Sequence, residues 1–154
     1  MDEFAKQLSQ VELFAGLKPE GLQLIAAVAA EETFGAGTKI FSHGEVGDKL
    51  YIILEGKIRI SREVSGMGEE ALAVLGAGQA FGEMALLDES PRSADAKAHE
   101  KCKLLSISKA RFDDLLFMQK DLAYEVLWST VRMLVRRLRE TTDKLTFLSV
   151  SGRF

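Results

Sequence analysis

The first thirty residues carry apolar positions at the spacing of amphipathic helices. Pro19 stands where the first turn of a helix tolerates a missing N–H group. The spacing therefore predicts a helical segment from Asp2 to about Glu31 with two apolar stripes. The stripes are Phe4, Leu8 and Val11 in the first, and Leu22, Ile25, Ala26 and Ala29 in the second.

From about residue 32 to residue 107 the pattern changes to short β runs separated by glycine. Glu55-Gly56 separates the first two runs and is typical of a two-residue hairpin turn. The density of glycine turns predicts an antiparallel barrel or roll. The predicted strands are 50–54 and 57–60, a pair within 62–75 around Gly66-Met67-Gly68, and finally 93–98 and 102–107.

Helical spacing returns after Ser108, a good N-cap residue. A first helix carries Phe112, Leu115 and Leu116, and a longer one runs from about Lys120 to Leu148. At 1.5 Å per residue the second helix is about 40 Å long, longer than a small roll can cover. Its apolar positions are spaced alternately by four and three, as in the seam of a coiled coil. Because this seam has no partner within the chain, it predicts a homodimer. The seam residues are Leu127, Val131, Leu134, Leu138, Thr141, Leu145 and Leu148.

The composition fits one compact domain, since 154 residues with 47% hydrophobic content can bury one core. We divide the chain into a β-roll with N-terminal helices (1–118) and a long C-terminal helix with its tail (119–154). The first part holds 13 Lys/Arg and 19 Asp/Glu, and the second holds 7 and 4. An acidic body argues against broad nucleic-acid binding, and the basic tail is typical of a solvated helix flank.

Nothing in the sequence indicates export or a membrane span. Cys102 is the only cysteine and cannot form an intramolecular disulfide. The N-terminus lacks the apolar run of a signal peptide, and no stretch approaches 18 uncharged apolar residues. We therefore expect a cytoplasmic protein that does not enter a membrane.

Residues 76–98 carry the candidate chemistry. Gly82 allows a ligand to approach the backbone, and the first turn of a short helix at 84–87 would offer N–H groups to a phosphate. Glu83 can accept from a ribose hydroxyl, and the planar fork of Arg92 matches phosphate oxygens, with the Ser93 hydroxyl beside it. These residue types together predict a nucleotide monophosphate site. The alternative is an ordinary surface salt bridge between Glu83 and Arg92.

The segment FGEMALLDESPRSADA closely resembles the phosphate-binding cassette of cyclic nucleotide-binding domains, the family that includes the catabolite activator protein. Upstream, GTKIFSHGEVGDKLYIILEG extends the resemblance, which covers essentially the whole chain. It implies an α+β, mainly β fold: an antiparallel, jelly-roll-like β-roll flanked by N-terminal helices and a long C-terminal dimerisation helix. It also implies cyclic AMP as the bound ligand. Carried over by residue, the ligand site comprises Gly82, Glu83, Met84, Ala85, Arg92, Ser93 and Ala94.

Within this resemblance, Gly82 and Glu83 contact the ribose 2′-hydroxyl and Arg92 pairs with the cyclic phosphate. Ser93 bonds the phosphate or the base, and Ala94 offers its backbone.

A second match lies near the end of the long helix. Arg139 to Leu145 resembles the helix stretch of the catabolite activator protein whose Thr-Ser pair contacts the adenine amino group, which adds Thr141 and Thr142 to the site. The preference for adenine over guanine comes from the resemblance alone, because a threonine hydroxyl can serve either base. The other interpretation of Thr141 is a polar residue that sets the register of the seam.

Catalytic and metal chemistry find no support in the sequence. His43 and His99 are far apart without a ligand pattern around them, and no nucleophile, Walker or metalloprotease motif is present. We therefore expect a cyclic nucleotide sensor that is not an enzyme, with no catalytic cofactor, no metal and an unknown downstream partner. We expect no DNA-binding domain in this chain.

Three alternatives stay open. Instead of a cyclic nucleotide sensor, the chain could be the effector-binding fragment of a helix-turn-helix regulator. It could also be a ligand-blind dimerisation module on the same fold, or a metal-free cyclic phosphodiesterase.

Overall fold

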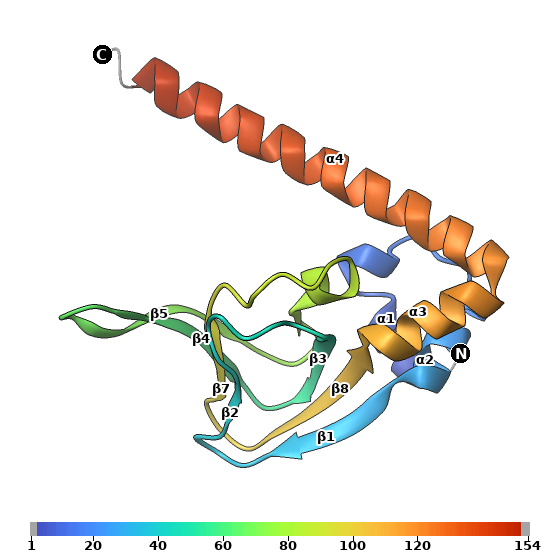
Figure 1. Ribbon diagram of the computed structural model, residues 1–154, viewed down its shortest axis with the longest axis horizontal. Helices are drawn as coiled ribbons and strands as arrows, with labels where there is room; N and C mark the ends of the chain where they lie inside the picture. Colours follow the sequence, from blue (N-terminus) through green and yellow to red (C-terminus); the bar gives the residue numbers. More distant parts are fainter. Residues whose placement is uncertain (1–2, 152–154) are drawn as a thin grey trace.

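A computed structural model describes residues 3–151, which form two four-stranded antiparallel sheets flanked by helices (Figure 1). The strand orders are β1-β8-β3-β6 and β2-β7-β4-β5. The strands are β1 (Ala30–Phe34), β2 (Lys39–Phe41), β3 (Lys49–Glu55), β4 (Ile58–Val64), β5 (Gly68–Leu75), β6 (Ala80–Phe81), β7 (Asp95–Ala98) and β8 (Cys102–Ser108). The helices are α1 (Glu3–Leu8), α2 (Pro19–Val28), α3 (Lys109–Met118) and α4 (Lys120–Ser151), with 3₁₀ turns η1 (Glu12–Phe14) and η2 (Glu83–Leu86). The predicted mainly β roll with N-terminal helices and a long C-terminal helix is confirmed.

One of the two predicted hairpins is wrong. β3 and β4 do not pair, because the turn at Glu55-Gly56 carries the chain from one sheet to the other. Gly56 has φ +93° there, and a Cβ atom on it would lie 2.4 Å from the carbonyl oxygen of Lys101. The glycine therefore serves close packing at a corner of the roll, which the sequence pattern does not distinguish from a hairpin turn. The second hairpin is confirmed, since β4 pairs with β5 from Val64–Gly68 to Ile58–Leu75.

β3 is apolar on both faces because it lies between two cores. Leu50 and Ile52 point into a core formed with the helices, whereas Tyr51 and Ile53 point into the space between the sheets. A strand with two buried faces reads as a continuous apolar run rather than an alternating one. This packing explains the run Leu50–Leu54 in the sequence.

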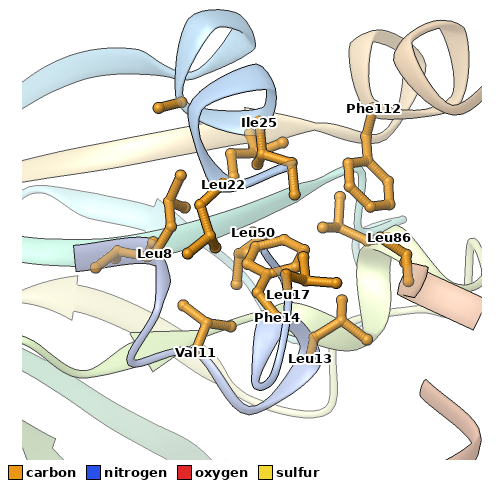
Figure 2. Close-up of a cluster of buried hydrophobic side chains, with 14 of the residues drawn as sticks. Leu8, Val11, Leu13, Phe14, Leu17, Leu22, Ile25, Leu50, Leu86 and Phe112 are labelled. Atoms are coloured by element: carbon orange, nitrogen blue, oxygen red, sulfur yellow. The ribbon is translucent and has the colours of Figure 1, made fainter. Parts of the chain in front are cut away.

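The helical core also holds Leu86, which belongs to segment 76–98. Figure 2 shows Leu86 of η2 among side chains of the N-terminal helices, of β3 and of α3. Leu86 is 3% exposed, and fully burying a leucine stabilises a fold by about 1.5–3 kcal/mol. The underside of η2 is therefore anchored to the helical core. The labelled neighbours are Leu8, Val11, Leu13, Phe14, Leu17, Leu22, Ile25, Leu50 and Phe112.

The starts of α2 and α3 follow the predicted signals, but the predicted helical segment ends at Val28 and not at about Glu31, because β1 begins at Ala30. Pro19 begins α2, and the Ser108 side chain accepts from the backbone N–H of Arg111 at 3.2 Å as the N-cap of α3. α4 is one continuous helix of 32 residues whose C-terminal half lies away from the two sheets (Figure 1). No helix in the described range 3–151 combines the length and the apolarity needed to cross a membrane.

Candidate functional site

A cavity of about 260 Å³ opens between η2, the loop that follows it and the inner faces of both sheets. Seven of the nine predicted site residues line it: Gly82, Glu83, Met84, Ala85, Arg92, Ser93 and Ala94. The remaining lining residues are Phe41, Ile60, Phe81, Asp88, Ser90 and Pro91. The structure therefore brings the predicted residues of segment 76–98 together around one cavity.

Gly82 begins the 3₁₀ turn in the left-handed region, with φ +75°. The sequence predicted a helical turn with unpaired N–H groups, and for Ala85 this is wrong. The Ala85 N–H donates to the Gly82 carbonyl at 3.1 Å, because a 3₁₀ turn pairs residues three apart. Ala85 is also buried, so it contributes to the wall of the cavity.

Arg92 is 9% exposed and is held by backbone carbonyls. Its Nη2 donates to the Lys49 carbonyl at 2.8 Å, and its Nη1 donates to the Gly82 carbonyl at 3.4 Å. The guanidinium carbon lies 4.1 Å from the centroid of the Phe41 ring, a cation–π geometry. These contacts fix the orientation of the guanidinium at the cavity.

Two glycines make room for this side chain. A Cβ atom on Gly47 would lie 2.8 Å from Arg92 Nε, and one on Gly82 would lie 2.6 Å from Nη1. Both distances are far below normal contact, so only glycine fits at either position while Arg92 keeps its place. Residues 35 apart in the chain thus form one slot for a guanidinium.

Arg92 is a buried cation that forms no ion pair among residues 3–151. Burial lowers the pKa of Arg92, and the charges of Tyr51, Asp48 and Glu45 oppose this shift. Burial also raises the pKa of Tyr51 to about 12, so its hydroxyl is neutral at pH 7. A desolvated guanidinium without an anionic partner is a favourable place for an oxyanion.

Glu83 pairs with Arg137 of α4 and not with Arg92. The alternative of a local salt bridge between Glu83 and Arg92 is therefore wrong. Arg137 Nη2 also donates to Glu12 Oε2 at 3.1 Å, and Arg137 Nη1 lies 3.8 Å from the sulfur of Met84. Glu83 Oε1 is thus occupied by an arginine from a helix that begins 37 residues later.

Thr141 and Thr142 do not line the cavity, and both side chains are exposed on α4. Thr141 lies four residues after Arg137, so it faces the same side of the helix one turn further on. Thr142 points about 100° further around the helix axis. Their predicted contact with a base stays a prediction.

Arg137, Glu12 and the apolar wall were not predicted from the sequence. Phe81 and Pro91 stand inside the quoted motif, so their places in the lining could have been inferred from it. Phe41 stands in the upstream stretch quoted above, whereas Ile60 lies outside both stretches, on a strand of the opposite sheet. Arg137 belongs to a basic run that looked like a solvated helix flank. Residues 3–151 contain no group of three or more His, Cys, Asp or Glu that could hold a metal ion.

The cavity therefore combines three kinds of surface. Arg92 offers a positive, planar set of donors, and Glu83 offers a carboxylate. Phe41, Ile60 and Phe81 supply apolar area. This combination suits a small ligand that has an anionic group, hydroxyl donors and a flat apolar part.

Known proteins are related to this chain in sequence. A family description, "Cyclic nucleotide-binding domain", matches residues 31–119. The "Cyclic AMP receptor protein" of Thermus thermophilus is 39% identical over 137 residues, which is 89% of this chain and 62% of that protein. The "CRP-like cAMP-activated global transcriptional regulator" of Mycobacterium tuberculosis is 30% identical over 99% of this chain and 66% of that protein.

A solved structure agrees over nearly its whole length. The N-terminal domain of a transcriptional regulator from Streptomyces coelicolor A3(2) has a TM-score of 0.80 at 33% identity, over 90% of this chain and 94% of that one. The present chain spans about two thirds of the length of the two relatives named above. The family description, over residues 31–119, covers both sheets, the cavity and α3. On this evidence the chain belongs to the cyclic nucleotide-binding domain family.

Proposed function

We propose that this chain binds cyclic AMP in the cavity as a regulatory ligand and that this binding is coupled to a rearrangement of α4. The observation that carries the proposal is Arg92, a buried guanidinium in the cavity wall that forms no ion pair among residues 3–151. A cyclic phosphate bears one negative charge and presents oxygens to such a fork. The names of the Thermus and Mycobacterium relatives support cyclic AMP as the nucleotide.

In this proposal each cavity residue has one role. Arg92 binds the cyclic phosphate, with help from the Ser93 hydroxyl and the Ala94 backbone. Glu83 accepts from the ribose 2′-hydroxyl through the oxygen that Arg137 leaves free, and Gly82 lets the ribose approach the backbone. Met84 and Ala85 complete the wall around the sugar.

The base is proposed to lie against the apolar wall and beneath α4. Thr141 stands one turn beyond Arg137, which already contacts the cavity residue Glu83. Thr141 also belongs to the seam, so its contact would fall at the boundary with a second chain, and Thr142 is the next residue on the helix. Both hydroxyls can accept from the adenine amino group.

The seam of α4 is proposed to form the homodimer. Leu134, Leu138 and Leu145 are 43%, 67% and 63% exposed, which is unusual for leucines repeated on one helix face. A ligand shifts a conformational equilibrium only through different affinities for the two states. Threonine contacts that exist only when α4 covers the base would supply that difference.

A second function is favoured by the relatives, because two of those named above are transcriptional regulators. The chain would then be the effector-binding part of such a regulator. In either case the role is regulatory rather than catalytic, and the cytoplasmic location belongs to this proposal.

Fluorescent cyclic AMP titrated into the protein, with chromatographic analysis of the nucleotide afterwards, tests these functions together. Saturable binding with intact nucleotide is expected. Conversion to the linear monophosphate would establish a phosphodiesterase, and absence of binding would leave a ligand-blind dimerisation module.

A further inference from the structure

Arg137 of α4 is shared by two carboxylates from distant parts of the chain. Its Nη2 donates to Glu83 Oε1 in η2 and to Glu12 Oε2 in η1, the latter at 3.1 Å. The other oxygen of Glu12 accepts from Arg136 Nη2 at 3.0 Å. Glu12 therefore holds two successive arginines of one helix through both of its oxygens.

These ion pairs lie where α4 leaves the body of the protein. The buried side of the helix ends at Met133, which is fully buried, and Arg137 is the last half-buried residue. Every residue from Leu138 to Val150 is exposed. Glu12 thus acts on the final turn of α4 that still touches the body.

The charges of this group reinforce one another. Burial raises the pKa of Glu12, but hydrogen bonds from Arg136 and Arg137 outweigh it, so the pKa of Glu12 is lowered. The hydrogen bond to Glu83 raises the pKa of Arg137, and the bond to Glu12 adds to this. Glu12 and Arg137 are consequently both charged at neutral pH.

An ordinary surface ion pair would have no effect on a ligand. Glu12 differs because the nitrogen it holds also holds Glu83, which lines the cavity. An arginine side chain has many rotamers in solvent, and a second carboxylate on the same nitrogen reduces them. Glu12 itself does not line the cavity, so it can act on a ligand only through Arg137.

We propose that Glu12 is a positioning residue for ligand binding: it holds Arg137 against Glu83 and thereby orients the carboxylate that receives the ribose 2′-hydroxyl. The inference rests on the proposed function. It adds the N-terminal 3₁₀ turn to the elements that set nucleotide affinity.

Affinities of the full chain for cyclic AMP and 2′-deoxy cyclic AMP, measured in five proteins, test this inference. The proteins are the wild type, Glu12→Gln, Arg137→Met, the double variant, and Asp113→Asn as a control that removes an exposed partner of Lys109. Glu12→Gln should reduce the preference for cyclic AMP about two- to fivefold, the range typical of one exposed ion pair. The deoxy affinity should stay unchanged. In the Arg137→Met background the Glu12 change should have no further effect, and the control should match the wild type.

Thermal melts of the same proteins identify any loss of folding, and Glu12→Asp, which keeps the charge but shortens the reach, should fall between wild type and Glu12→Gln. An unchanged nucleotide preference in Glu12→Gln, an equal loss for both nucleotides, or an effect that persists without Arg137 overturns the inference alone. A wild type that binds neither nucleotide overturns the proposed function and this inference with it.

Discussion

The cavity and the C-terminal half of α4 differ in how much of their surroundings a single chain supplies. Around Arg92, two glycines, two carbonyls and an aromatic ring are already in place. Every residue of α4 from Leu138 to Val150 is exposed, and its apolar positions in this range face solvent. The phosphate side of the proposed site is therefore preorganised, whereas the base side needs α4 and, in our proposal, a second copy.

This difference separates two kinds of energetic contribution. Interactions that exist before binding set the basic affinity, because little further ordering is required. Interactions that form only when α4 is placed by its partner contribute to the difference between states. Variants around Arg92 should accordingly lower the basic affinity for the nucleotide, whereas variants of α4 should change the difference between the conformational states.

The largest expected effect comes from Arg92→Gln, which removes the phosphate partner. Truncating one side of a buried charge-assisted contact typically costs about 2–5 kcal/mol, so calorimetry should detect a loss of at least about thirtyfold in cyclic AMP affinity. The exposed Arg111→Gln on α3 is the matched control. If Arg92→Gln keeps the wild-type affinity, the cavity around Arg92 is not the cyclic AMP site.

Leu138→Glu tests the α4 side of the comparison. It places like charges opposite each other in the apolar seam, so sedimentation should find monomers where the wild type is a dimer. Phe147→Glu serves as the control, since Phe147 is similarly exposed, at 71%, but lies outside the seam. A wild type that is monomeric with and without ligand contradicts the dimer.

Glu83→Gln should have a smaller effect that is specific to the ribose. Hydrogen bonds to charged groups contribute roughly 1.5–3 kcal/mol, so the preference for cyclic AMP over its 2′-deoxy analogue should fall about tenfold or more. Competition binding with the two nucleotides measures this preference. If the wild type binds both equally, Glu83 does not bind the ribose.

The smallest effect is expected for the helix threonines. Thr141→Ala with Thr142→Ala removes neutral hydrogen bonds of about 0.5–1.5 kcal/mol each, so the ratio of cyclic AMP to cyclic GMP affinity should fall several-fold. The same ratio in the Leu138→Glu monomer sharpens the comparison, because the proposed contact from the partner is lost there. An unchanged ratio in the double variant leaves Thr141 as a residue that sets the register of the seam.

The cavity could be predicted from the sequence because its polar residues lie within one continuous segment, Gly82 to Ala94. Local signals at Pro19 and Ser108 also predicted where α2 and α3 begin. By contrast, Glu83 and Arg137 are 54 residues apart, and Glu12 and Arg137 are 125 apart. No periodicity in a single sequence links such positions, so the pairing of α4 with η2 and η1 required the structure.

The error at Glu55-Gly56 has a similar cause. A glycine with positive φ serves a hairpin turn and a corner between sheets equally well. The choice is made by distant backbone at Lys101 and Cys102, which packs against Gly56. The local sequence therefore predicted a turn at Gly56, but it could not predict that β3 and β4 on either side of the turn do not pair with each other.

A crystal structure of the chain with cyclic AMP tests the central claim most directly. We expect the cyclic phosphate within hydrogen-bond distance of the Arg92 guanidinium and the ribose 2′-hydroxyl on Glu83, with Arg137 still bonded to that carboxylate. A nucleotide bound elsewhere, or one whose phosphate points away from Arg92, would contradict it.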